Sequence, residues 1–371
     1  MSKIKNIEKI PEESREVVEV GLGAALKKKS LGKTKINFVQ IENSLSGGKT
    51  GAAVFVARYG ITDKTTFVRV LKIAPKEICE SENEGYVKTR ETLLDIFSQV
   101  EYYSEDEFPS GKDKYGILLY QDIGTVAASD LKGIAKYFTN KILKADNENK
   151  TESKEDTEKF SRELSLLMQK EVFLSLKKGL YGTVKRRDVN FSDNYGKKLI
   201  SDKVKQGLAE LKEIDSSLPD YSTILEYFNI NATYHEVNYV HGDLNPENVL
   251  VWENERGFLN CKLIDFCEVM PKKRDTFTPL FWDYSRLLGE MILNFVEEIF
   301  VAASNDKAKP LEGEQTFVRL QEVSRLLNDL RRAEVIQDYF YCQILFFLFF
   351  AKFQRENPYK RLFGVNFALS F

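Results

Sequence analysis

The stretch HGDLNPENVLV, residues 241–251, answered by LIDF at residues 263–266, decides how this sequence is interpreted. The first run begins as a polar turn and continues into apolar, β-branched residues, which is typical of a turn followed by a strand. The second run predicts another short strand that ends in an acidic residue. Two adjacent strands would bring Asn248 and Asp265 together at one end of a hairpin, with Asp243 at its mouth.

Two carboxylates and one carboxamide in this arrangement suit phosphoryl transfer. One carboxylate can orient a hydroxyl, while the other carboxylate and the amide oxygen hold magnesium against nucleotide phosphates. The alternative is a surface hairpin in which Asn, Asp and Pro serve only to make turns. The residue types and their spacing favour the chemical interpretation.

The same run resembles the catalytic loop and metal-binding Asp of the protein-kinase-like superfamily. It is most similar to the aminoglycoside and choline phosphotransferase branch, which has His-Gly-Asp where protein kinases have His-Arg-Asp. The resemblance implies that Asp243 is the catalytic base and that Asn248 and Asp265 are ligands of Mg²⁺. The Asp-Phe-Gly of protein kinases is absent. Gly242 stands in place of the Arg of His-Arg-Asp, so there is no obvious site at which a phosphorylated activation loop could bind.

Composition predicts a large globular protein. The chain has 371 residues, of which 43% are hydrophobic, enough for two lobes. Lys and Arg number 54 against 56 Asp and Glu, so charge gives no case for a nucleic-acid or membrane partner. Four mostly distant cysteines and two histidines disfavour a disulfide framework or a zinc site. The N-terminus lacks the apolar core of a signal peptide, and we expect a cytoplasmic protein.

The first part of the chain predicts an N-terminal helical extension over residues 1–34, with a helix that starts just after Pro11. Strand patterns then flank a glycine turn. Gly47, Gly48 and Gly51 would let backbone N–H groups approach the phosphate oxygens of ATP. On its own this hairpin is weak evidence for nucleotide binding, and its value comes from the strand that follows.

Residues 65–73 predict a third strand in which Lys72 stands among apolar neighbours. The resemblance assigns Lys72 to the α- and β-phosphates of ATP, while the alternative is a solvated strand lysine. An acidic helix follows, and one of its glutamates is expected to fix the Lys72 ammonium. Glu84 is preferred because it immediately precedes the apolar face, with Glu80 and Glu82 left open.

Residues 115–124 predict a buried strand that leads, by resemblance, to a hinge near residue 121. The backbone there would meet the nucleotide base, so the candidates for the adenine pocket are residues 119–122, with Leu119, Gln121 and Asp122 among them. A charged insertion near 144–159 is expected to be exposed. The basic stretch 177–200 fits a solvated connector or a contact for an anionic partner.

The last third of the chain predicts helices. One begins at Phe281, and Asp283 near its start resembles the family's scaffold residue, which binds the backbone of the catalytic loop. It equally fits a carboxylate that caps a helix start. The most apolar run, residues 339–353, is short for a bilayer span and predicts a buried helix.

The resemblance, which covers roughly residues 45–293, implies an α+β, two-lobed protein-kinase-like fold. A small antiparallel β-sheet N-lobe is expected at 35–121 and a mostly helical C-lobe at 122–371. The expected activity is ATP- and Mg²⁺-dependent transfer of the γ-phosphoryl group to a hydroxyl of a small molecule or of a protein Ser or Thr. Two alternatives stay open: a nucleotide-binding pseudokinase that acts as a regulatory or scaffolding module, and transfer of another part of the nucleotide, such as AMP.

Overall fold

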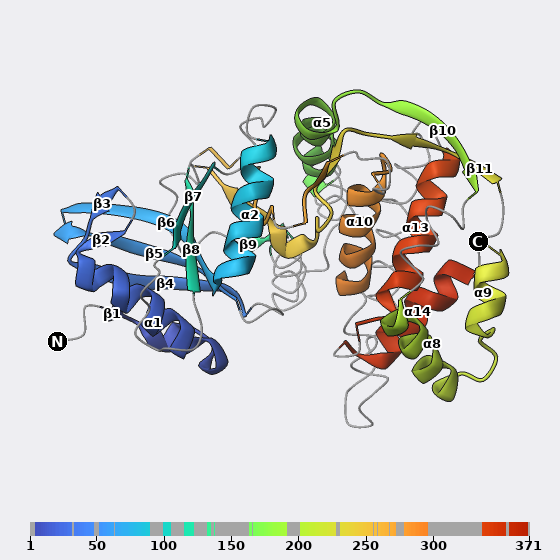
Figure 1. The fold of residues 1–371 in the computed structure, drawn as a ribbon, viewed down its shortest axis with the longest axis horizontal. Helices are drawn as coiled ribbons and strands as arrows, with labels where there is room; N and C mark the ends of the chain where they lie inside the picture. The colour runs from blue at the N-terminus through green and yellow to red at the C-terminus, as the bar shows by residue number, and fades with distance from the viewer. Residues whose placement is uncertain are drawn as a thin grey trace, which may run out of the picture. The chain divides into compact units, whose positions relative to one another are not determined.

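The chain is a mixture of α-helices and β-strands (Figure 1). Its contacts divide it into two compact units, made of residues 1–140, 170–175 and 247–269 in the first, and of 141–169, 176–246 and 270–371 in the second. The computed structural model describes residues 4–31, 33–47, 52–62, 64–89, 99–104, 115–121, 132–134, 137, 163–164, 166–190, 201–227, 231–254, 256–257, 259–266, 268–271, 278–295, 336–353 and 356–369.

The first unit is built around a six-stranded sheet in the order β1-β4-β5-β6-β8-β7. Neighbouring strands are antiparallel except for β1, which pairs parallel with β4. The elements of this unit are β1 (Ile4–Lys5), η1 (Ile7–Lys9), α1 (Glu12–Lys28), β2 (Ser30–Leu31), β3 (Thr34–Lys35), β4 (Phe38–Gly47), β5 (Ala53–Thr62), β6 (Thr65–Pro75), α2 (Lys76–Thr89), β7 (Gln99–Ser104), β8 (Tyr115–Gln121), β9 (Lys132–Gly133), β13 (Val249–Glu253) and β14 (Leu259–Leu263).

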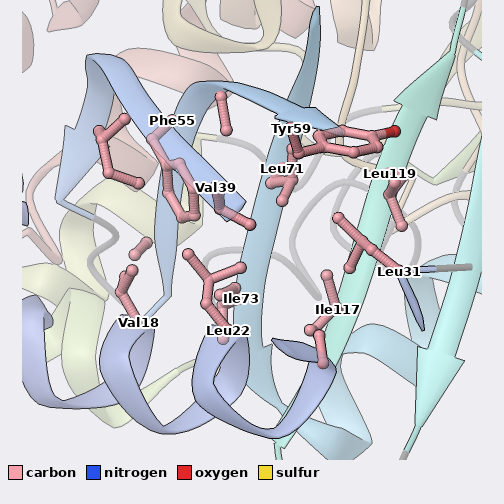
Figure 2. Close-up of a cluster of buried hydrophobic side chains, with 14 of the residues drawn as sticks. Val18, Leu22, Leu31, Val39, Phe55, Tyr59, Leu71, Ile73, Ile117 and Leu119 are labelled. Atoms are coloured by element: carbon pink, nitrogen blue, oxygen red, sulfur yellow. The ribbon is translucent and has the colours of Figure 1, made fainter. Parts of the chain in front are cut away.

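Helix α1 covers one face of this sheet. It begins directly after Pro11, as predicted, with two glutamates in its first turn and two lysines in its last, charges that complement the helix dipole. Figure 2 shows its apolar side chains, Val18 and Leu22 among them, against strand residues such as Phe55 and Ile73. The expected N-terminal extension therefore shares the hydrophobic core of the sheet.

The opposite face of the sheet is covered by α2 and by the β13–β14 hairpin. Cys79 of α2 packs with Leu118, while Leu250 and Ile264 of the hairpin region pack with Tyr120. Strand β9 pairs with β13 and adds a third strand beside the hairpin. Because both faces are covered, a central strand such as β5 is buried at nearly every position over its first eight residues, and does not alternate between core and solvent.

The second unit is mostly helical. Its elements are α8 (Asp202–Ile214), α9 (Tyr221–Tyr227), α10 (Trp282–Phe295), α13 (Ile336–Phe350), α14 (Pro358–Leu369), the 3₁₀ turn η4 (Pro246–Asn248), which runs on into the first unit, and the pairs β10 (Lys185–Asn190) with β11 (Asn231–Glu236) and β12 (Tyr239–Val240) with β15 (Met270–Pro271). The helical turns η2 (Leu167–Phe173) and α5 (Leu174–Leu176) are divided between the two units, and η3 (Lys177–Tyr181) belongs to the second.

Helix α13 forms the core of the second unit. Leu345 to Phe350 are all buried, and Phe349 makes an edge contact with Trp282 of α10. A helix that is apolar on every side is stable when neighbours surround it. The buried helix predicted from the apolar run is therefore confirmed. Within the described part of the chain, no helix combines the length and the hydropathy needed to cross a membrane.

The mixed helix-and-strand class and the antiparallel sheet follow the expectation from sequence. Residues 122–140, 170–175 and 247–269 are part of the predicted C-lobe, but their contacts group them with the sheet unit. The hinge near residue 121 and the boundaries 35–121 and 122–371 stay predictions, and the insertion at 144–159 lies outside the described residues.

Candidate functional site

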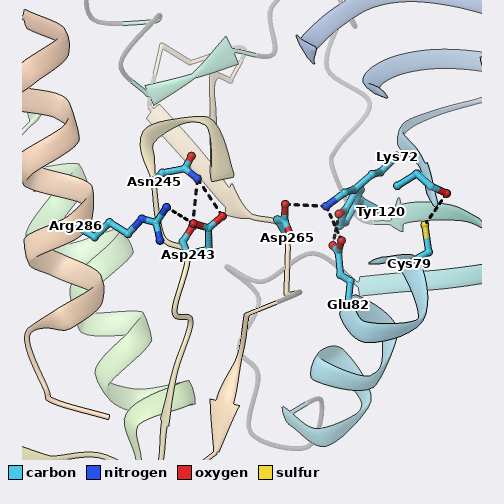
Figure 3. A network of polar contacts seen from close by, with 9 residues as sticks. Lys72, Cys79, Glu82, Tyr120, Asp243, Asn245, Asp265 and Arg286 are labelled. Carbon is cyan, nitrogen blue, oxygen red and sulfur yellow. Dashed lines mark hydrogen bonds and ion pairs between the residues drawn. The ribbon is translucent and has the colours of Figure 1, made fainter. Parts of the chain in front are cut away.

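The first unit holds a buried ion-pair network around Lys72, shown in Figure 3. The Lys72 ammonium lies 2.8 Å from Oε2 of Glu82 and 2.7 Å from Oδ2 of Asp265. Lys72 is 3% exposed and Glu82 is fully buried. A buried charge is costly unless it is paired, so this lysine is held at one point between two carboxylates.

The partner on α2 is Glu82, which corrects the preference for Glu84. Cys79, Glu82 and Thr89 are buried, and their spacing of three and seven residues places them on one face of the helix. Glu84 lies off that face and is exposed. Proximity to the apolar run was the wrong criterion, because the helix turns 100° per residue and only one stripe faces the sheet.

Tyr120 is a further member of the network that the sequence interpretation did not single out. Its hydroxyl donates to Oε1 of Glu82, the oxygen that Lys72 leaves free. Leu118 of β8 pairs with Lys72 of β6, so their side chains lie on the same face of the sheet. Tyr120 is two residues further along β8, and its side chain therefore points to that same face. This position depends on the register between β6 and β8, which the sequence alone did not provide.

The ionisation of this network follows from its burial. Burial raises the pKa of Glu82 to about 7, repulsion by Asp265 adds to the rise, and Lys72 opposes it. For Lys72, burial by itself lowers the pKa, but attraction to Glu82 and Asp265 outweighs it and raises the pKa above its usual range. Lys72 therefore stays protonated throughout the physiological range, while Glu82 titrates near neutrality.

Asn248 and Asp265 come together at one end of the β13–β14 hairpin, as the sequence predicts. Val249 pairs with Leu263, and one step further the N–H of Ile264 donates to the carbonyl oxygen of Asn248 at 3.0 Å. Asp265 follows directly, with a φ of 65°. This left-handed conformation is uncommon for a residue with a side chain and is found preferentially at functional positions.

Gly85 of α2 approaches the backbone that carries Asp265. A Cβ on Gly85 would stand 2.2 Å from the carbonyl oxygen of Phe266, which is far inside contact distance. Tyr86, the next residue, makes an edge contact with the Phe266 ring. The helix that supplies Glu82 is therefore packed directly against the residue that follows Asp265.

Asp243 belongs to the second unit, where it forms an ion pair with Arg286 of α10 (Figure 3). Asn245 Nδ2 lies 3.4 Å from Oδ2 of Asp243 and 3.3 Å from its main-chain oxygen. The side chain of Asp243 is 23% exposed and that of Arg286 is 10% exposed. The predicted base is thus accessible while it is held by a largely buried cation.

Asp283 binds the backbone of the predicted catalytic loop. Its two carboxylate oxygens accept hydrogen bonds from the N–H groups of His241 and Gly242, each at 2.8 Å. Tyr181 OH lies 3.3 Å from the same carboxylate, and burial raises the pKa of Asp283. Of the two roles left open for Asp283, the structure shows contact with the loop backbone.

Comparison with solved structures matches the chain to one described as "Glucosamine kinase (crystal form A)". The match has a TM-score of 0.37 and 12% sequence identity, and it covers 97% of this chain and 98% of that chain. No protein-family model matches the sequence, and no curated protein matches it. At this TM-score the likeness carries no argument about activity, so the site is interpreted from the contacts within this chain.

The other nucleotide-site candidates are only partly described. Gly47 is the last residue of β4 and Gln121 the last of β8. Gly48, Gly51 and Asp122 lie outside the described residues. The Leu119 side chain packs in the core beneath α1, on the sheet face opposite Lys72 (Figure 2). The expectation for Leu119 concerned its backbone, and that stays a prediction.

Arg286 was not among the residues that the sequence pointed to. It follows Asp283 by three residues on α10, so both side chains project from the same face of the helix. A basic residue at this spacing from a predicted scaffold carboxylate is the signal that would have found it. Its relevance depends on the position of Asp243, which is distant in sequence.

Proposed function

We propose that this chain is an ATP- and Mg²⁺-dependent phosphotransferase that moves the γ-phosphoryl group to a hydroxyl of a small molecule or of a protein Ser or Thr. Its two units would then correspond to the lobes of a protein-kinase-like fold of the aminoglycoside and choline phosphotransferase type. The observation that carries the proposal is the buried Lys72 between Glu82 and Asp265. Lys72 and Glu82 lie ten residues apart, and Asp265 joins them from 193 residues away. Grouping such charges in the interior is costly, and binding of phosphate would explain why they are there.

Lys72 is the proposed contact for the α- and β-phosphates. Its charge is retained at every physiological pH, and Glu82 restrains the ammonium from the α2 side. A cation held in place before the substrate arrives needs little reorganisation during the reaction. The backbone around Gly47, Gly48 and Gly51 is proposed to bind the phosphates as well, as the sequence pattern suggests.

Asn248 and Asp265 are the proposed ligands of Mg²⁺. Both supply oxygen, the donor that magnesium prefers, and the hairpin places their backbones next to each other. Magnesium in such a site supplies neutralisation of charge on the transferring phosphoryl group. Asp265 contacts Lys72, and we propose that Lys72 exchanges this contact for phosphate when nucleotide binds.

Asp243 is proposed to orient the acceptor hydroxyl and to receive its proton. The side chain is partly exposed, and Asp283 holds the two preceding backbone N–H groups, so the loop that presents Asp243 is fixed. A base with a fixed position contributes mainly by orientation in this type of reaction.

A second candidate is a nucleotide-binding module without turnover. The direct contact of Lys72 with Asp265 favours it, because the charges needed for ATP and Mg²⁺ are already satisfied by each other. Both candidates bind nucleotide. They differ in whether a phosphoryl group is transferred.

The deciding experiment incubates the purified chain with γ-labelled ATP, Mg²⁺ and a cell extract split into protein and small-molecule fractions. Transfer of label into one fraction supports the phosphotransferase and names the acceptor class. Asp243→Ala should retain ATP binding and lose transfer, Asp265→Ala should lose Mg²⁺-dependent binding, and Glu213→Gln on the exposed side of α8 serves as the control. ATP binding by the wild type with no label in either fraction, and none on the chain itself, would favour the second candidate.

A further inference from the structure

Side chains from one turn of α10 bind both the N–H and the carbonyl oxygen of Gly242. Asp283 accepts from the N–H of Gly242, while Trp282 Nε1 and Arg286 Nη1 donate to its carbonyl oxygen at 3.3 and 3.2 Å. Gly242 has a φ of 81°, which a residue with a Cβ adopts only at a cost. The residue immediately before Asp243 is therefore fixed in conformation from one helix.

Arg286 also contacts the side chain of Asp243. While Nη1 binds the Gly242 carbonyl, Nη2 pairs with Oδ1 of Asp243, and Nε lies 3.4 Å from Oε1 of Glu290. The guanidinium is planar and presents its donors in a rigid fork, so one Arg can hold a backbone oxygen and a carboxylate at once. Glu290, one turn further along α10, forms an ion pair with the guanidinium group.

The two oxygens of Asp243 are consequently unequal. Oδ1 is bound by a charged donor, whereas Oδ2 has a 3.4 Å contact with the neutral amide of Asn245, at the outer limit of a hydrogen bond. Charge-assisted hydrogen bonds are about twice as strong as neutral ones. Arg286 therefore restrains the Asp243 carboxylate through Oδ1.

We propose that Arg286 is a positioning residue, which holds Asp243 through Oδ1 in the orientation that receives the acceptor hydroxyl; this rests on the proposed phosphotransferase function. In the step it serves, the acceptor oxygen forms a bond to the γ-phosphorus, the bond from that phosphorus to the β–γ bridging oxygen breaks, and ADP leaves with that electron pair. The acceptor proton passes to the Asp243 carboxylate. Arg286 itself takes no proton because it is already fully protonated.

The most specific test is Arg286→Lys. This variant keeps the positive charge and the aliphatic part of the side chain but loses the planar guanidinium group with its several donors. A single ammonium is not expected to hold the Gly242 carbonyl and the Asp243 carboxylate in the same geometry. Because the side chain is buried, Arg286→Gln is a second variant that retains a donor for the carbonyl without the charge. Arg256→Lys, at an exposed position, is the control.

The experiment measures kcat and KM for ATP in the transfer reaction, in the wild type, Arg286→Lys, Asp243→Asn and the double variant, after thermal melts have shown that each is folded. Arg286→Lys should lower kcat by about 10- to 100-fold, the scale of a misplaced reacting group, and leave KM for ATP within about twofold. In the Asp243→Asn background the same change should lower the residual rate no further, because residues that act as a unit are not additive.

Equal losses from Arg286→Lys in both backgrounds would overturn the proposal, since they would show that Arg286 acts independently of Asp243. An unchanged kcat in both Arg286 variants would also overturn it. A wild-type chain that transfers no phosphoryl group would instead defeat the proposed function, and this inference with it. The presence or absence of wild-type turnover tells the two failures apart.

Discussion

The ammonium of Lys72 lies 2.8 Å from a carboxylate oxygen of Glu82, and both side chains are buried. Lys72 comes from β6 and Glu82 from α2, the helix that follows that strand. Lys72 also pairs with Asp265, so its buried charge is compensated by two carboxylates.

Replacing Glu82 by Gln should weaken transfer far more than replacing Glu84 by Gln. Glu82→Gln keeps the size of the side chain but removes the charge that restrains Lys72, and a loss of about 10- to 100-fold in rate is expected. Glu84 is exposed, so its variant should stay close to wild type. Initial rates with γ-labelled ATP test this, and equal rates in the two variants would contradict the assignment of Glu82.

The stability of the protein should depend on pH through Glu82. Its pKa of about 7 lies above the ordinary 4.5, so the folded chain retains a proton that the unfolded chain has released. The stabilisation is complete below pH 4.5 and is lost as pH rises through about 7. Urea unfolding from pH 4.5 to 8 should show this decline in the wild type and not in Glu82→Gln; parallel profiles would refute it.

Tyr120→Phe should destabilise the protein through one missing hydrogen bond. The ring still fills the cluster with Val56, Val70 and Leu250, but the donor to the buried Glu82 carboxylate is gone. A hydrogen bond to a charged group contributes about 1.5–3 kcal/mol. Denaturant unfolding of the single and double variants tests this, because the effect should shrink in the Glu82→Gln background. The same cost in both backgrounds would mean that Tyr120 stabilises by another route.

Gly85→Ala should lower both stability and activity, whereas Gly23→Ala should not. The added methyl on Gly85 would meet the Phe266 carbonyl at 2.2 Å, and nothing lies within 4 Å of a Cβ on Gly23. Overpacking costs about 1–3 kcal/mol, while Gly to Ala in an open helical position stabilises by about 0.5–1 kcal/mol. Thermal melts and transfer rates of the two variants check the contrast. A Gly85→Ala protein as active as wild type would show that α2 and the segment after Asp265 are not tightly coupled.

Local patterns in the sequence predicted most of the elements of the sheet unit. Helix α1 after Pro11, strands β4 to β6 and the hairpin of β13 and β14 all follow from apolar periodicity and turn residues, which act over a few neighbouring positions. The same local logic placed Asn248 and Asp265 together, because a hairpin fixes which residues meet at its end.

Tertiary structure decided which charges pair. The choice of Glu82 over Glu84 depends on which side of α2 faces the sheet. The contacts of Tyr120 and Arg286 join residues that are 38 and 44 positions apart in the chain. Such contacts are set by packing between elements, and local sequence carries no record of them. The sequence by itself determined the elements and the chemical types available; the packing of helices on the sheet and on the loop at Gly242 determined which of those groups work together.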